Sequence, residues 1–123
     1  MKFSEEFIEG ANLIRSYEKG KIAINDSIFT RSLIVSTYKL KPDWAPLLCE
    51  EIQKEHIDEL FEDDPEIVIL GTGATLCFPS ADILRHVQSK GSSLEVMDSG
   101  AACRTFNILV SEGRQVTAGL MML

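Results

Sequence analysis

The first third of the chain alternates apolar with polar residues, which is typical of β-strands. Residues 13–17 lead into a turn at Lys19–Gly20. Residues 21–25, with isoleucines at alternate positions, lead into a second turn at Asn25–Asp26. The segment Ile28–Val35 follows and is rich in β-branched and aromatic residues. This order predicts an antiparallel β-meander.

A short helix is expected in the middle of the chain. Ile57, Leu60 and Phe61 recur at helical spacing, and Pro65 prevents the helix from continuing. The acidic residues Glu62–Asp64 stand at its C-terminal end, where negative charge opposes the helix dipole. Such a cluster is more typical of a solvated corner than of a metal site.

The second half of the chain predicts the order strand–helix–strand–helix–strand. Ile67–Leu70 is continuously apolar, as in a strand buried on both faces. Ser80 and Asp98 can each cap a helix, and a glycine follows each helix to end it. The remaining strands are Leu94–Met97 and Gln115–Leu123. Crossovers of this length imply right-handed parallel connections. The last strand is apolar enough to be central or to pack at an interface, and a homo-oligomer is one alternative for the assembly.

Length and composition agree with one folded unit. The chain has 123 residues, of which 45% are hydrophobic and 25% are charged, as in ordinary soluble globular proteins. The sequence therefore predicts a single α/β domain, residues 1–123, with an antiparallel β-meander followed by a βαβαβ half.

The net charge narrows the range of partners. Nineteen acidic and twelve basic residues give a formal charge of −7, and no basic patch suited to nucleic acid is visible. No apolar run approaches the roughly 20 residues that cross a bilayer, and Glu5–Glu6 stand where a signal peptide would be cationic or apolar. We therefore expect a cytoplasmic protein without nucleic-acid binding or direct membrane insertion.

Metal and cofactor sites are not expected. Cys49, Cys77 and Cys103 are widely spaced, and the two histidines are equally isolated, so reduced and mostly buried thiols are the favoured interpretation. The glycines at 71 and 73 resemble the start of a dinucleotide-binding fingerprint, but Leu76 replaces its third glycine.

Candidate chemistry gathers where two of the predicted parallel strands end. One strand ends in Gly71, Thr72 and Gly73, and the other runs into Asp98, Ser99, Cys103 and Arg104. Ligands of parallel sheets bind beyond the carboxyl ends of the strands, so neighbouring strands would bring both loops to one crevice. A glycine-rich turn, a helix N-terminus and an arginine together favour a small-molecule or anion ligand.

Cys103 admits two interpretations. In the first turn of a helix beside Arg104, its thiolate would be stabilised and could act as a nucleophile. On the helical wheel, however, it lies on the flank of an apolar face that contains Ala102 and Phe106, and no general base is near in sequence. We therefore favour a half-buried packing cysteine, and we assign no catalytic residue.

The charged residues beside the candidate site also have structural interpretations. Arg104 points away from the apolar face and is expected to be exposed, to pair with Asp98 or Glu95, or to bind an anion. Glu95 interrupts a strand that should be buried, so it needs a partner such as Arg104 or Arg114.

Two motif blocks resemble a known family. Ile69–Gly73 forms the first block, and Glu95–Ser99 with Ala101–Asn107 and Glu112–Arg114 forms the second. In combination they are similar to the small domain of mitochondrial respiratory complex I assembly factor three and its bacterial and archaeal relatives. The likeness covers nearly the whole chain and adds Asn107 to the candidate site.

The resemblance implies a fold and a function class. It implies three layers, with a mixed central sheet and an additional antiparallel β-layer, and no established catalytic activity. The eukaryotic relatives assist the assembly of a respiratory complex. Ser99 replaces a usual threonine, and Phe106 replaces a usual tyrosine, which removes a phenol from any mechanism that needs one. No mitochondrial presequence is visible, which favours a bacterial origin.

The leading hypothesis is therefore a non-enzymatic binding or assembly factor with a protein partner, acting in the cytoplasm. The alternative is a small-molecule or anion-binding protein, or a cysteine-dependent enzyme, that uses the crevice between Gly71–Gly73 and Asp98–Arg104.

Overall fold

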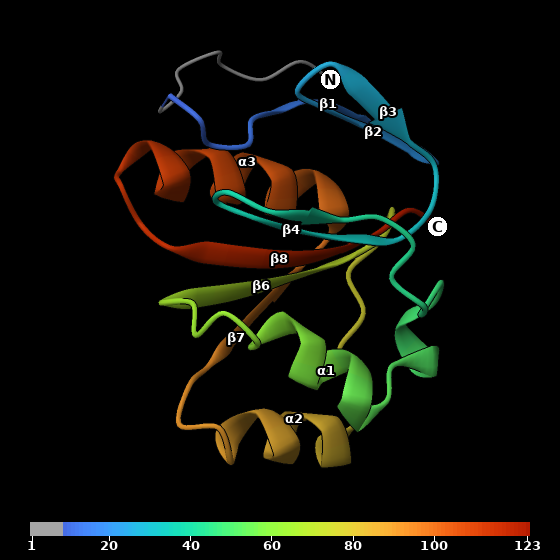
Figure 1. The fold of residues 1–123 in the computed structure, drawn as a ribbon. Coiled ribbons are helices and arrows are strands. Elements are labelled where there is room, and N and C mark those ends of the chain that lie inside the picture. The colour runs from blue at the N-terminus through green and yellow to red at the C-terminus, as the bar shows by residue number, and fades with distance from the viewer. Residues whose placement is uncertain (1–8) are drawn as a thin grey trace.

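A computed structural model describes residues 9–123, which form two β-sheets, three α-helices and one turn of 3₁₀-helix (Figure 1). The smaller sheet has the order β1-β2-β3 and consists of β1 (Ile14–Glu18), β2 (Lys21–Ile24) and β3 (Ser27–Phe29), all antiparallel. The larger sheet has the order β5-β4-β8-β6-β7 and consists of β4 (Leu33–Ser36), β5 (Leu40–Lys41), β6 (Ile67–Thr72), β7 (Leu94–Met97) and β8 (Val116–Met121).

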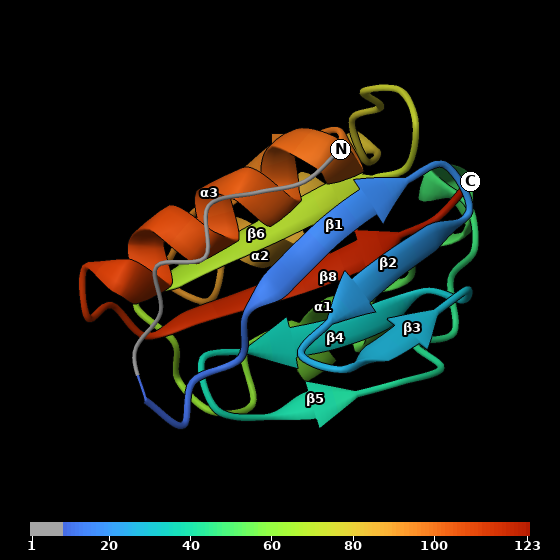
Figure 2. The ribbon, with the colours of Figure 1, turned by 90° about the horizontal axis from the view of Figure 1, so that it is seen from above.

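The helices lie on both faces of the larger sheet. They are α1 (Lys54–Leu60), α2 (Ala81–Gln88) and α3 (Ser99–Ser111), and the 3₁₀ turn η1 (Cys49–Glu51) precedes α1. Seen from above, α3 and the smaller sheet lie side by side over one face of the larger sheet (Figure 2). Helices α1 and α2 cover the opposite face. The fold is thus a three-layer α/β arrangement, as the resemblance implied.

The larger sheet is mixed because its two halves come from different parts of the chain. The βαβαβ half supplies β6, β7 and β8, which pair in parallel with β6 in the middle. Strand β4 comes from the N-terminal third and pairs antiparallel with the other edge of β8. The last strand is therefore central, which is one of the two positions that its apolar sequence predicted.

Alternating side chains divide the interior into two cores. On β6, Val68 and Leu70 face α1 and α2, whereas Ile69 faces α3 and the smaller sheet. On β4, Ile34 faces the first group, and its neighbours on either side face the second. A sheet covered on both faces needs strands that are apolar at every position, which explains the continuous run that begins at Ile67.

The predicted helix ends are mostly confirmed. The Ser80 hydroxyl accepts a hydrogen bond from the Ile83 amide, and the Asp98 carboxylate accepts one from the Ala101 amide. Beyond α3, Gly113 adopts a left-handed backbone with φ of +81°, as a C-terminal glycine should.

One strand prediction was wrong in its extent. The segment Ile28–Val35 is not a single strand, because residues 30–32 carry the chain from β3 in the smaller sheet to β4 in the larger one. The main-chain oxygen of Ser32, within this link, accepts a hydrogen bond from the Trp44 amide. Both halves have the composition of a strand, so composition does not reveal where the chain changes sheet.

The fold predicts a specific intolerance at Gly119 in β8. A Cβ atom there would lie 2.8 Å from the Trp44 ring and 2.9 Å from Leu60 Cδ2. Gly119→Ala should therefore lower the free energy of unfolding by about 1–3 kcal/mol through overpacking. Urea denaturation followed by circular dichroism measures this change.

Gly100→Ala is the matched control for that substitution. A Cβ atom at Gly100, in the first turn of α3, would meet nothing nearer than 3.4 Å. Alanine is also the better helix former, so the free energy of unfolding should stay equal or rise slightly. Equal loss of stability in the two variants would contradict the packing described for β8.

Candidate functional site

Strands β6 and β7 are neighbours, so the structure does bring the two candidate loops to one edge of the larger sheet. Gly71 and Thr72 end β6, and Asp98 follows β7 directly as the cap of α3. The predicted convergence of the loops is therefore real. What the converging groups do is decided by their hydrogen bonds.

The serine hydroxyl at the start of α3 joins three segments. Ser99 Oγ accepts a hydrogen bond from the Gly73 amide over 2.8 Å and donates one to the Met121 oxygen over 2.5 Å. The Ser99 amide in turn donates to the Gly73 oxygen over 2.8 Å. Because Ser99 is fully buried, these bonds satisfy a hydroxyl that would otherwise be costly to bury.

Backbone crowding explains the glycines of this loop. Gly73 has φ of +95°, and a Cβ atom there would lie 1.6 Å from the Leu123 main-chain oxygen. At Gly71 a Cβ atom would lie 3.0 Å from both Ala102 Cβ and Ser99 Oγ. Both glycines therefore allow β6, α3 and the C-terminal residue to approach one another closely.

Thr72 stabilises the loop that leaves β6. Its hydroxyl lies 2.7 Å from the Thr75 oxygen and 3.3 Å from the Met97 oxygen, and it accepts a hydrogen bond from the Cys77 amide over 3.1 Å. This side chain is buried and holds its own loop against the end of β7. Its polar atom is engaged within the chain.

Cys103 is more deeply buried than the helical wheel predicted. Its side chain is fully inaccessible, because the smaller sheet covers the flank of α3 on which it lies. Burial raises the pKa of the Cys103 thiol to about 12, although the nearby Arg104 acts in the opposite direction. The thiol is therefore protonated at neutral pH, and protonated thiols are poor nucleophiles.

Asn107 and Arg104 lie about one turn apart on α3 and have different surroundings. The Asn107 side-chain oxygen accepts from the Ile14 amide over 3.0 Å, and its nitrogen donates to the Ile14 oxygen over 2.7 Å. This paired contact fixes α3 to β1, at the bulge where β1 and β2 shift register. Arg104 is exposed, as predicted.

The expectation for Glu95 was wrong. Strand β7 is the edge of the larger sheet, and the Glu95 side chain is exposed, so it needs no buried partner. Arg114 instead pairs with Glu66, with its Nε 3.1 Å from a carboxylate oxygen. The main chain of Gln115 also donates to Glu66, and these bonds lower the pKa of that carboxyl.

Metal-binding and redox groups are sparse in the described part of the chain. No group of three or more histidine, cysteine or acidic side chains within residues 9–123 is placed to hold a metal ion. Cys49 and Cys103 are buried, Cys77 is half-buried, and none of the three forms a disulfide.

A hollow of about 440 Å³ between α1 and α2 was not expected from the sequence. Its lining includes Glu50, Glu55 and Asp82 at the rim and the buried Ile52 and Ile83 beneath them. It lies on the face of the larger sheet opposite to Cys103. The sequence signal for this surface is the concentration of acidic residues around α1. The sequence-based interpretation of an acidic cluster concerned only Glu62–Asp64.

Comparisons with known proteins agree with the resemblance seen in the sequence. The chain is 32% identical over 122 residues to the 13 kDa major membrane protein of Francisella tularensis, which covers 95% of this chain and 96% of that protein. It is 40% identical over 62 residues to NADH dehydrogenase (ubiquinone) 1 alpha subcomplex assembly factor 3 of Danio rerio. That match covers 50% of this chain and 36% of the assembly factor, so the chain spans about a third of that relative's length.

Solved structures share the fold. The NMR structure of a Xanthomonas campestris protein aligns with a TM-score of 0.82 at 32% identity, over 90% of this chain and 84% of the other. Within residues 9–123 we find no helix with the length and hydropathy needed to cross a membrane. Residues 14–121 match the family described as protein of unknown function DUF498/DUF598, and the chain belongs to that family.

Proposed function

We propose that this chain is a non-enzymatic protein-binding factor of the assembly-factor type, acting in the cytoplasm. The observation that carries the proposal is the engagement of the candidate site's polar groups. Ser99, Thr72 and Asn107 each form hydrogen bonds within the chain. The Cys103 thiol is buried, and its raised pKa makes it a poor nucleophile. The name of the Danio rerio relative adds support, since an assembly factor works by binding other proteins.

The positions of the histidines also support a non-enzymatic role. His56 Nδ1 accepts a hydrogen bond from the Gln53 amide over 2.9 Å, and its ring packs edge-on against Trp44. His86 Nε2 lies 2.7 Å from a carboxylate oxygen of Asp58. Trp44 and the helices that carry both histidines belong to the core on the other face of the sheet from Cys103. The sheet therefore separates the thiol from each imidazole that could act as its base.

We expect affinity purification from the native host, with mild chemical crosslinking, to recover a defined protein partner. The expected result is one protein enriched reproducibly with the chain, at a yield that a mock purification does not give. Recovery of no specific protein, together with turnover of a defined substrate by the purified chain, would contradict the proposal.

Cys103 should resist alkylation in the folded protein. Because the thiol is buried and its pKa is raised to about 12, iodoacetamide at pH 7 should label the half-buried Cys77 first. Cys103 should react at a comparable rate only after unfolding in denaturant, and peptide mass mapping follows both sites. Rapid labelling of Cys103 in the native state would instead support the cysteine-dependent enzyme.

The second candidate is an anion or small-molecule site at the Gly71–Gly73 and Asp98–Arg104 edge. The parallel pairing of β6 and β7 favours it, since both loops meet beside the start of α3. The internal bonds of Ser99 and Thr72 weigh against it, because they leave those groups engaged.

A thermal-shift screen separates the two candidates. A ligand that binds the native state raises the unfolding midpoint. Because Ser99 and Thr72 are engaged in internal bonds, we expect phosphate, nucleotides and carboxylates at millimolar concentration to leave the midpoint unchanged. Arg104→Ala is the control variant. A shift that occurs in the original chain and disappears in Arg104→Ala would establish the anion site and displace the first proposal.

A further inference from the structure

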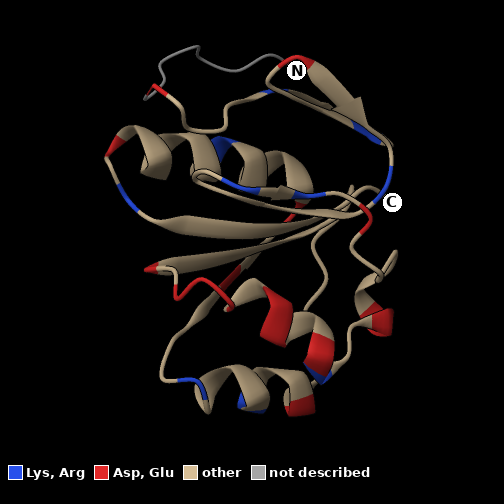
Figure 3. Cartoon of the chain, in the orientation of Figure 1, with Lys and Arg blue, Asp and Glu red and all other residues tan. Residues whose placement is uncertain are grey.

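The negative charge of this protein is concentrated in one segment. Residues 50–64 contain eight acidic residues and one lysine, a net charge of −7 that equals the charge of the whole chain. The other 108 residues are therefore electrically balanced. In Figure 3 this segment is the acidic stretch that includes η1, α1 and the turn after it. The concentration produces a directional field rather than a uniform acidic surface.

The two ends of this acidic segment have different surroundings. At its C-terminal end, Lys39 lies 3.1 Å from Asp63, and Lys41 lies 2.6 Å from Glu62, so β5 and the turn before it offset two of the carboxylates there. At its N-terminal end, no ion pair within residues 9–123 involves Glu50 or Glu55. Two carboxylates without an ion pair in the described residues thus line the hollow between α1 and α2.

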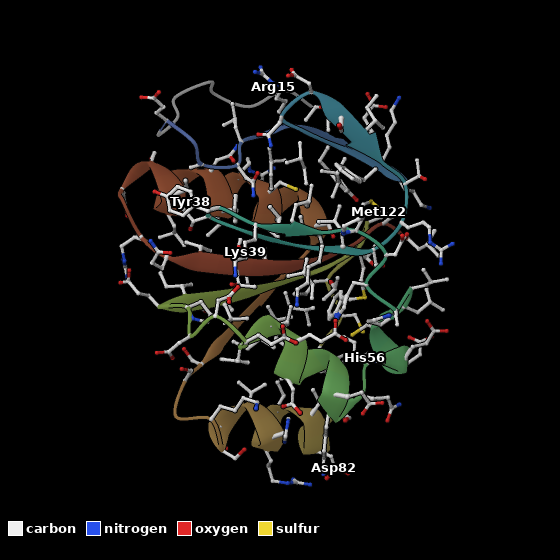
Figure 4. All side chains as sticks on the ribbon, viewed as in Figure 1. Arg15, Tyr38, Lys39, His56, Asp82 and Met122 are labelled. Atoms are coloured by element: carbon white, nitrogen blue, oxygen red, sulfur yellow. The ribbon has the colours of Figure 1, made fainter. Side chains whose placement is uncertain are left out.

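The hollow combines acidic walls with an apolar base. Glu50 and Glu55 line it from the η1–α1 side, and Asp82, which pairs with Arg85, lines it from α2. Lys54 also lies on the rim and offsets one of these charges. Figure 4 shows His56 and Asp82 near the first turns of α1 and α2, at the same end of the molecule.

Large apolar side chains are exposed next to this hollow. The Cys49 thiol contacts the Cys77 main-chain oxygen at 3.4 Å, which joins η1 to the loop between β6 and α2. The residues beside this contact are Leu48, 39% exposed, and Phe78, 64% exposed. Leu47 and Leu76 extend the same two segments and are also exposed. We call these four side chains the apolar rim. Phe78 and Leu48 each lie two residues from a residue that lines the hollow.

We propose that the hollow and the apolar rim bind a basic, apolar segment of a protein partner. This inference rests on the proposed protein-binding function and assigns it a surface. Apolar side chains of the partner would cover Leu48 and Phe78, and its lysine or arginine side chains would lie against Glu50 and Glu55. Exposed apolar side chains that gather within a polar border are typical of an interaction surface, and complementary charge favours one partner over another.

The negative charge beside the apolar rim favours a basic protein segment over a lipid bilayer as the binding partner. The cytoplasmic leaflet carries a negative surface potential, which attracts basic protein segments and repels acidic ones. Here the apolar rim is bordered by carboxylates, so an approach to anionic lipid would be opposed over about 8 Å at physiological salt. A cationic peptide experiences the opposite force.

The test uses the full chain and a defined probe. The probe is a synthetic 14-residue amphipathic peptide of leucine and lysine, and its counterpart has glutamate in place of lysine. We expect the lysine peptide to bind and to move the backbone amide NMR signals of residues 47–55 and 76–83. Leu48→Ser with Phe78→Ser should weaken binding at least tenfold. Glu50→Gln with Glu55→Gln should weaken it several-fold and reduce its salt dependence.

Ile108→Ser is the matched control, because Ile108 is 57% exposed on α3, on the other face of the sheet. It should leave the affinity unchanged, and unfolding curves confirm that each variant is folded. Absence of binding, equal binding of the glutamate peptide, or equal binding by the Leu48/Phe78 variant overturns the inference. Binding to phosphatidylglycerol vesicles that depends on Leu48 and Phe78 also overturns it, in favour of a membrane surface.

The same variants distinguish this inference from the proposed function. If the original chain and the Leu48/Phe78 variant recover the native partner in equal yield, the surface is wrong and the protein-binding function stands. If the original chain recovers no partner and the purified chain turns over a defined substrate, the proposed function fails independently of the peptide result. Loss of the partner in the Leu48/Phe78 variant, with retention in Ile108→Ser, supports both.

Discussion

The structure depends on burying strand β8 on all sides. All six of its residues are buried, and it pairs with β4 along one edge and with β6 along the other. The backbone N–H and C=O groups of a strand in this position find hydrogen-bond partners only in the neighbouring strands. Its apolar side chains are buried only if a layer packs on each face of the sheet. One layer must therefore be α3 with the smaller sheet, and the other must be α1 with α2. Small residues in β8 permit this close cover, since the Trp44 ring lies directly over Gly119.

The same requirement explains why polar groups at the predicted crevice bond to the chain itself. Helix α3 begins immediately after β7, and the Ser99 hydroxyl at its start accepts a hydrogen bond from the Gly73 amide and donates one to the Met121 oxygen. In larger parallel sheets, helix N-termini and loops beyond the strands are open to ligands. Here those groups connect three segments of a short chain, and the main-chain oxygen of Leu123 occupies the space beside Gly73. The two loops converge as in a binding site, and the Ser99 hydroxyl, the Thr72 hydroxyl and the Gly73 amide bond within the fold.

Sequence patterns predicted the elements that carry strong local signals. The apolar run from Ile67, the caps Ser80 and Asp98, and the parallel order of the second half all follow from spacing and residue type. Features that depend on tertiary neighbours were not predictable. The chain changes sheets between Ile28 and Val35 without a change in composition, and Glu95 is exposed because β7 is an edge. For the site, convergence of the loops was predicted. The burial of Cys103 was underestimated, because a flank of α3 that would be open on an isolated helix is covered by the smaller sheet.

The two faces of the larger sheet therefore differ in what they offer to other molecules. On the α3 face, Cys103 is buried beneath the smaller sheet, and Asn107 bonds the helix to β1. On the other face, α1 is only seven residues long, and two of its three acidic side chains, Glu55 and Glu59, are in no ion pair within residues 9–123. A short helix at the surface contributes little to the core beyond Ile57 and Leu60, so its remaining positions are free to be acidic without loss of packing. That freedom allows charge to collect around α1. The exposed Leu48 and Phe78 lie beside the N-terminal end of the same segment, near Glu50 and Glu55, which line the hollow. The apolar side chains and the carboxylates thus lie at the same end of the molecule, which is why that end is the surface we propose for recognition.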